Sequence, residues 1–151
     1  MPLNLTISHH FPAPPDLVFE TMNDPEQFQH WMKNFVRAEV TAGGSEFGVG
    51  TKISETRRFG GKDATEVFEV THYDPPRAIS LHVDSCQGSS CDFDMLYEPE
   101  SGGTAVTMNG TIQGGNFFVR LMTRMMSGVF KRAMRKDFEA LDEYIRSKQT
   151  A

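Results

Sequence analysis

The chain has 151 residues, a length at which one domain buries roughly 70% of its extended surface and builds its own core. Hydrophobic residues make up 38% and aromatic residues 11%, which excludes an intrinsically disordered chain. No apolar run reaches the roughly 20 residues of a membrane span, and the first residues lack the pattern of a secretory signal. We therefore expect a single cytoplasmic domain over residues 1–151, without integral membrane association.

Charge is unevenly distributed along the chain. The formal net charge is −5, but residues 117–151 carry eight Lys and Arg against four Asp and Glu. This segment could meet an acidic partner, although we favour a long helix with a solvated basic face. Aromatic residues do not alternate with the basic ones, so no nucleic acid partner is expected.

The first elements are short. Alternating apolar and polar residues predict a strand at residues 3–7, which ends before the prolines that begin at Pro12. A helix is predicted over residues 16–22. A second short helix restarts at Asp24, which caps it, and Pro25 takes its first position. Phe28 and Trp31 would lie on one face of this second helix.

Six further strands are separated by turns that contain glycine or proline. They are predicted at residues 35–41, 51–59, 62–73, 77–84, 90–97 and 104–113. The Gly60–Gly61 pair is typical of a two-residue hairpin. The last element is a helix over residues 117–148, which has no proline and is rich in helix formers.

The turn positions predict which residues face each other on neighbouring strands. The expected pairs are Ile53–Phe68, Glu55–Glu66, Arg57–Ala64, Val70–Leu81, Phe68–Val83, Leu81–Met95, Val83–Phe93, Tyr97–Val106, Met95–Met108 and Phe93–Gly110. Four hairpins therefore agree on one apolar face, made of Ile53, Phe68, Val70, Ile79, Leu81, Val83, Phe93, Met95, Met108 and Ile112. The sequence predicts a curved antiparallel sheet that covers the long helix.

The final helix has two apolar stripes. The first comprises Phe118, Met122, Met125 and Val129, and the second Phe130, Met134, Phe138, Leu141 and Ile145. A basic stripe of Arg120, Arg124, Lys131 and Arg135 is expected to face solvent. Methionine suits adaptable binding surfaces as well as ordinary cores, so Met122 and Met125 are either cavity or core residues.

Four stretches of the chain carry a resemblance to a known superfamily. They are FPAPPDLVF at residues 11–19, Asp24 through Trp31, GVGT at residues 48–51, and VTHYDPPR at residues 70–77. With the order of elements, they resemble the SRPBCC superfamily of START and Bet v 1-like proteins, especially its polyketide cyclase/dehydrase and lipid-transport branch. The resemblance covers nearly the whole chain. It implies an α+β helix-grip fold, in which about seven strands wrap around the C-terminal helix and two short helices lie between strands 1 and 2.

The superfamily contains carriers, enzymes and co-chaperones, so the resemblance implies a cavity between sheet and helix more strongly than an activity. Glu55, Arg57 and Glu66 are expected to point inward on adjacent strands. They form a polar group at one end of an apolar pocket, a general acid/base pair, or a set of solvated charges where the strands leave the core. No signature of a nucleophilic hydrolase, zinc protease or nucleotide-binding loop is present.

We expect a non-catalytic domain that binds, and carries or sequesters, a hydrophobic small molecule or lipid. The predicted ligand-binding residues are Trp31, Ile53, Glu55, Arg57, Phe68, Leu81, Val83, Phe93, Met95, Met108, Met122, Met125 and Phe130. One alternative is a cyclase or dehydratase, with Glu55, Glu66 and Tyr97 as candidate acid/base residues. The other is a co-chaperone-like interaction module that uses the basic stripe.

No cofactor and no metal are expected. His82 and the carboxylates near it are interpreted as a solvated, ion-paired strand face rather than a metal site. Cys86 and Cys91 are too few and too close for a disulfide framework, and nothing near them in the sequence would activate a thiolate. The ligand and the oligomeric state stay open.

Overall fold

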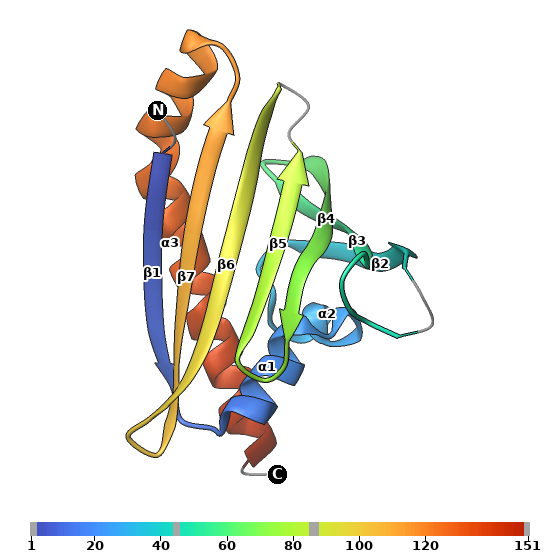
Figure 1. Cartoon of the computed structure of the whole chain (residues 1–151), viewed down its shortest axis with the longest axis vertical. Coiled ribbons are helices and arrows are strands. Elements are labelled where there is room, and N and C mark those ends of the chain that lie inside the picture. The colour runs from blue at the N-terminus through green and yellow to red at the C-terminus, as the bar shows by residue number, and fades with distance from the viewer. Residues whose placement is uncertain (1–2, 44–45, 85–87, 150–151) are drawn as a thin grey trace.

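The computed structural model describes residues 3–43, 46–84 and 88–149. The elements are β1 (Leu3–Phe11), α1 (Pro15–Asn23), the 3-10 turn η1 (Pro25–Gln27), α2 (Phe28–Trp31), β2 (Phe35–Ala42), β3 (Lys52–Phe59), β4 (Lys62–Asp74), β5 (Ala78–Asp84), β6 (Ser89–Glu100), β7 (Gly103–Gly114) and α3 (Phe117–Gln149). The seven strands form one antiparallel sheet in the order β1-β7-β6-β5-β4-β3-β2. The sheet curves around α3, and α1 and α2 lie near its lower end (Figure 1). The predicted helix-grip fold is confirmed.

The short helices form where a capping residue and prolines favour them. Asp24 accepts a hydrogen bond at Oδ1 from the Glu26 backbone N–H, at 3.0 Å, and Pro25 occupies the first position of η1. Phe28 and Trp31 are both buried, with ring centroids 5.9 Å apart in an edge-on arrangement. These rings fix α2 against the rest of the core.

Three of the four predicted hairpin registers are confirmed. The pairs on β3–β4, β4–β5 and β6–β7 are those expected, including Glu55 opposite Glu66. On β5–β6 the prediction is wrong by two residues, because Leu81 pairs with Phe93 and Val83 with Cys91. A shift of two residues leaves every side chain on its original face, so the hydrophobic pattern cannot detect it. The expected turn residue Gln87 lies outside the described residues.

The core lies between the concave face of the sheet and the second half of α3. Val70, Ile79 and Val83 are buried on the sheet side, and Phe138, Leu141 and Ile145 on the helix side. Gly110 lies opposite Phe93, as expected. A Cβ atom at Gly110 would lie 3.4 Å from Phe93 Cδ1 and 3.1 Å from Leu5 Cδ1, so glycine leaves room for both side chains.

The first half of α3 differs from the prediction. Phe118, Met122, Met125 and Val129 are exposed, and Val119, Thr123 and Ser127 are the half-buried residues. A continuous helix turns a single stripe toward the sheet. The stripe of Phe130, Met134 and Phe138 continues toward the start of α3 through the three half-buried positions, so the other predicted stripe faces outward. The first turns of α3 also pass beyond the end of β1 (Figure 1). The basic stripe lies in solvent as predicted, with Lys131 half-buried.

Candidate ligand-binding site

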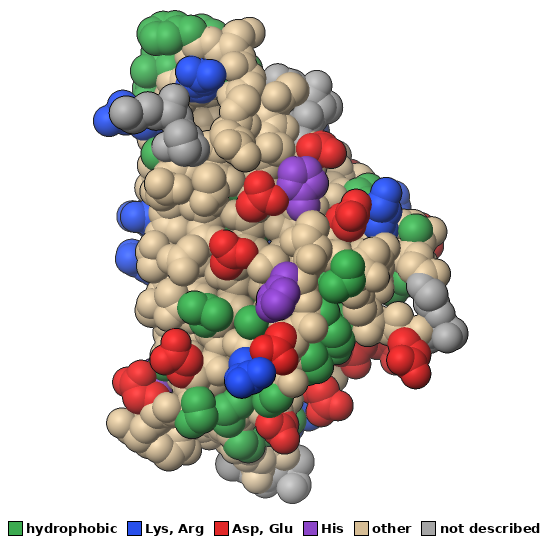
Figure 2. Space-filling model, viewed as in Figure 1, with side chains coloured by type: hydrophobic (Ala, Val, Ile, Leu, Met, Phe, Trp, Pro, Cys, Tyr) green, Lys and Arg blue, Asp and Glu red, His purple; other side chains and the backbone are tan. Residues whose placement is uncertain are grey.

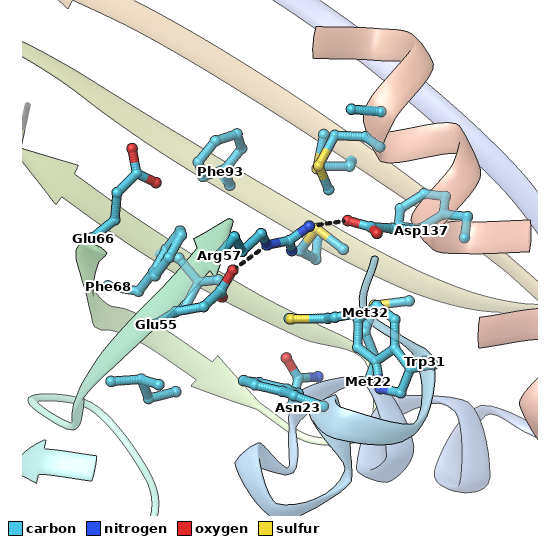
Figure 3. A pocket seen from close by; sticks show the side chains of 18 of the residues that line it. Met22, Asn23, Trp31, Met32, Glu55, Arg57, Glu66, Phe68, Phe93 and Asp137 are labelled. Carbon is cyan, nitrogen blue, oxygen red and sulfur yellow. Dashed lines mark hydrogen bonds and ion pairs between the residues drawn. The ribbon is translucent and has the colours of Figure 1, made fainter. Parts of the chain in front are cut away.

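A cavity of about 350 Å³ opens between the sheet, α2 and the second half of α3 (Figure 3). Its volume lies within the range of small-molecule sites. Most of its walls are apolar, and four charged side chains gather along one part of them. The lining residues are Met22, Asn23, Phe28, Trp31, Met32, Phe47, Ile53, Glu55, Arg57, Phe59, Ala64, Glu66, Phe68, Ile79, Leu81, Phe93, Met95, Met108, Phe130, Ala133, Met134, Asp137 and Phe138.

The structure brings together most of the predicted ligand-binding residues. Those that line the cavity are Trp31, Ile53, Glu55, Arg57, Phe68, Leu81, Phe93, Met95, Met108 and Phe130. Val83 is buried in the core and does not line it. Met122 and Met125 are 46% and 71% exposed on the first half of α3, so the prediction that they face the cavity is wrong.

Arg57 forms the centre of a buried ionic cluster. Its Nε donates to Glu55 Oε1 at 2.5 Å and its Nη1 to Asp137 Oδ2 at 2.7 Å (Figure 3). The Asp137 side chain is 2% exposed, and its Oδ1 also accepts from the Lys33 backbone N–H at 3.1 Å. Burial opposes the charge of Arg57, but Glu55 and Asp137 outweigh it and raise the pKa of the guanidinium. The cluster therefore ties β3 to α3 beside the cavity.

Asp137 is the charged cavity residue that the sequence analysis did not identify. It lies on the face of α3 that also carries Phe130, Met134 and Leu141, so it is an acidic side chain within an apolar stripe. A buried carboxylate of this kind requires a partner, and Arg57 is the cation that the cavity supplies. The sequence signal was the charge in the stripe, although it could not identify the partner.

Glu66 lies opposite Glu55 and lines the cavity, but no hydrogen bond or ion pair within the described ranges involves it. Glu66 is exposed at one side, but desolvation of its carboxyl at the cavity wall first, and then the charge of Glu55, raises the pKa of Glu66, and Arg57 offsets this in part. Arg57 already has two carboxylate partners. The polar part of the cavity thus carries one guanidinium and three carboxyl groups, which favours hydrogen-bond donors and cations over anions.

Replacing Glu66 with glutamine is expected to stabilise the protein at pH 7, by up to about 1 kcal/mol because the site is open to solvent. The raised pKa means that the ionised carboxylate is less stable in the folded state. Ionised Glu66 destabilises the fold increasingly as pH rises from the pKa of Glu66 in the unfolded chain through its pKa in the folded chain. The stabilisation by Glu66→Gln should therefore vanish near pH 4. Urea denaturation at both pH values measures it, with Glu98→Gln on the outer face as control. A Glu66→Gln variant that is less stable at pH 7 contradicts the prediction.

Tyr97 is not among the residues that line the cavity, and it is 1% exposed behind the cavity wall. Its hydroxyl donates to Met22 Sδ at 3.0 Å and accepts from Asn23 Nδ2 at 3.1 Å. Burial raises the pKa of the Tyr97 hydroxyl, which keeps it protonated. The structure therefore does not place this candidate acid where it could reach a ligand.

Two other predicted features are structural. Cys91 is a free thiol whose pKa burial raises to about 12, so it is not a thiolate nucleophile, and Cys86 lies outside the described residues. His82 shares hydrogen bonds with Asp92 at 2.7 Å and Asp84 at 2.9 Å. Within the described part of the chain, no group of three or more His, Cys, Asp or Glu side chains could hold a metal ion.

Comparison with known proteins agrees with this architecture. A family model described as polyketide cyclase / dehydrase and lipid transport matches residues 2–146. A search of curated proteins finds no match. The helices of the described residues include none long and apolar enough to cross a membrane.

Several solved structures share the fold. TTHA0849 from Thermus thermophilus is 18% identical, with 97% of this chain and 99% of that chain covered and a TM-score of 0.78. A protein from Arthrobacter aurescens is 19% identical, covering 96% and 87%, with a TM-score of 0.76. Ara h 8.0201 is 16% identical, covering 97% and 99%, with a TM-score of 0.75. At these identities the similarity establishes the fold alone.

Proposed function

Because the chain belongs to the polyketide cyclase/dehydrase and lipid transport family, we propose that it binds one hydrophobic small molecule or lipid between sheet and α3. It would carry or sequester this ligand without chemical change, as a single domain in the cytoplasm. The observation that supports the proposal is the cavity of about 350 Å³, whose apolar walls surround one small charged cluster. Burial of apolar ligand surface would supply the affinity, at roughly 25 cal/mol per Å² before ordering costs.

The charged cluster suggests the polarity of the ligand. Two donor groups of Arg57 are already occupied by Glu55 and Asp137, and Glu66 has no described partner. A ligand carboxylate or phosphate would therefore approach an excess of negative charge. A hydroxyl, amine or amide N–H would instead find an accepting carboxylate. We propose a ligand with an apolar body and a hydrogen-bond donor at one end.

Two dyes with the same ring skeleton test this proposal. N-phenyl-1-naphthylamine is neutral and carries an N–H donor, and 8-anilino-1-naphthalenesulfonate adds a sulfonate to it. We expect the neutral dye to bind with enhanced fluorescence, and the sulfonate to bind about tenfold more weakly or worse. Replacing Glu55 and Glu66 together with glutamine should reduce the difference in affinity between the two dyes. Absence of binding by both dyes contradicts a ligand cavity, and tighter binding of the sulfonate contradicts the proposed polarity.

Glu66 also supports a second candidate function, that of a cyclase or dehydratase. It lines the cavity, it lacks a described partner, and its raised pKa suits proton exchange nearer neutral pH. Native mass spectrometry of protein from its own host distinguishes a carrier from an enzyme that removes water from its substrate. A carrier should retain the same compound in wild type and Glu66→Gln. A dehydratase variant should instead retain a compound heavier by one water.

A further inference from the structure

The first four turns of α3 expose an unusually apolar surface. Seven large hydrophobic side chains are between 44% and 81% exposed there: Phe117, Phe118, Leu121, Met122, Met125, Met126 and Val129. At 100° per residue they cover about half of the helix circumference. We call this set the α3 apolar surface. Single exposed hydrophobic residues are ordinary, but a contiguous group on one helix indicates an interaction site.

The inward side of the same turns is less apolar than the outward side. Val119, Thr123 and Ser127 are the half-buried residues that follow the inward stripe. The Thr123 hydroxyl donates to the Val119 carbonyl oxygen at 2.8 Å, and the Ser127 hydroxyl to the Arg124 carbonyl oxygen at 2.9 Å. The larger apolar residues therefore face outward although smaller and more polar ones face the protein. Packing among the described residues does not account for that choice of residues.

The charge around this surface has one sign. Residues 117–136 contain six Lys and Arg and no Asp or Glu, whereas the rest of the chain holds nine Lys and Arg and all 20 Asp and Glu. Arg120 and Arg124 are exposed on the same turns as the α3 apolar surface. Figure 2 shows hydrophobic side chains gathered at the top end of the molecule and acidic side chains spread over the sheet face. The complementary partner is apolar and anionic.

We propose that the first half of α3 docks on the surface of a bilayer that contains anionic lipid. The α3 apolar surface would enter the boundary between headgroups and acyl chains, and Arg120 and Arg124 would contact lipid phosphates. The surface lies on a projecting end of α3 and carries three flexible methionine side chains, so it suits insertion into lipid better than docking in a rigid groove of a protein (Figure 1). It ends at Val129, next to Phe130 in the cavity wall, so docking brings the cavity close to the lipid. The docking itself does not depend on what the cavity binds.

Vesicle flotation tests this proposal. We expect the full chain to float with phosphatidylcholine vesicles that contain phosphatidylglycerol, and about tenfold less with phosphatidylcholine alone or in high salt. Phe118→Glu with Met125→Glu should reduce binding at least about tenfold, and so should Arg120→Glu with Arg124→Glu. All four side chains are exposed, so folding should survive. Matched controls are Val67→Glu with Leu96→Glu and Lys62→Glu with Arg77→Glu, at exposed positions on the strands and turns of the sheet.

The outcomes separate the possible occupants of the α3 apolar surface. Loss of vesicle binding in the helix variants alone supports lipid docking. Failure of the wild type to float, or equal floating of helix and control variants, overturns it. A dimer in light scattering that Phe118→Glu with Met125→Glu dissociates, without vesicle binding, also overturns it and assigns the surface to self-association. Salt-sensitive capture of an acidic protein without vesicle binding overturns it in favour of a protein partner.

Discussion

Replacing Asp137 with alanine is expected to lower the free energy of unfolding by about 3 kcal/mol, at the lower end of the range for broken buried ion pairs. The change removes the 2.7 Å bond from Arg57 Nη1 and leaves the Lys33 backbone N–H without its acceptor. The lower end applies because Arg57 still reaches the cavity, where water can solvate it in part. Urea denaturation at pH 7 measures the loss.

Two further variants show whether the loss arises from the ionic cluster. Glu139→Ala lies on the exposed side of α3 and controls for the change in helix charge. Arg57→Met combined with Asp137→Leu removes this ion pair and leaves Glu55 without its cation in the double variant as in the Arg57→Met variant, so the double variant should be less destabilised than the sum of the single changes. If Asp137→Ala and Glu139→Ala differ by less than about 1 kcal/mol, the cluster is not the buried network described above.

Replacing Ala133 with tryptophan is expected to weaken binding of N-phenyl-1-naphthylamine at least about tenfold, which is about 1.4 kcal/mol. Ala133 lies in the cavity wall on α3 but is itself exposed, so a larger side chain can enter the cavity without displacing the core. The indole would occupy space that the dye requires. A fluorescence titration of each variant gives the two dissociation constants.

The control for this prediction introduces the same tryptophan side chain at a position outside the cavity. Ala42→Trp puts the same side chain at an exposed position on β2, away from the cavity. It should leave dye affinity within about twofold of the wild-type value. Equal weakening by both substitutions, or no weakening by Ala133→Trp, would mean that the dye binds elsewhere.

The sequence predicted the features that short-range rules determine. The Gly60–Gly61 turn and strict alternation fixed Ile53 against Phe68, and with it the inward position of Glu55 and Glu66. The β5–β6 register was wrong because a two-residue shift leaves the alternation unchanged. The sequence could therefore predict on which face of the sheet each side chain lies, but it could not predict which residue pairs with it on the neighbouring strand.

The candidate site was predictable on its sheet side and less so on its helix side. Met122 and Met125 satisfied the amphipathic pattern, yet α3 turns Val119, Thr123 and Ser127 toward the protein on the same turns and leaves these methionines exposed. Asp137 was missed because its partner Arg57 is 80 residues away in the chain. Whether a cavity remains between sheet and helix depends on how far α2 and α3 lie from the sheet. No local sequence pattern encodes that separation.

Methionine methyl groups provide the most direct test of ligand binding in the cavity. Met22, Met32, Met95, Met108 and Met134 line it, whereas Met122, Met125 and Met126 lie on the exposed half of α3. We expect a titration with N-phenyl-1-naphthylamine, monitored by NMR of carbon-13-labelled methionine methyls, to shift the five cavity signals. The signals of Met122, Met125 and Met126 should stay in place. Shifts confined to the three helix signals, or none at all, would contradict a ligand site between sheet and helix.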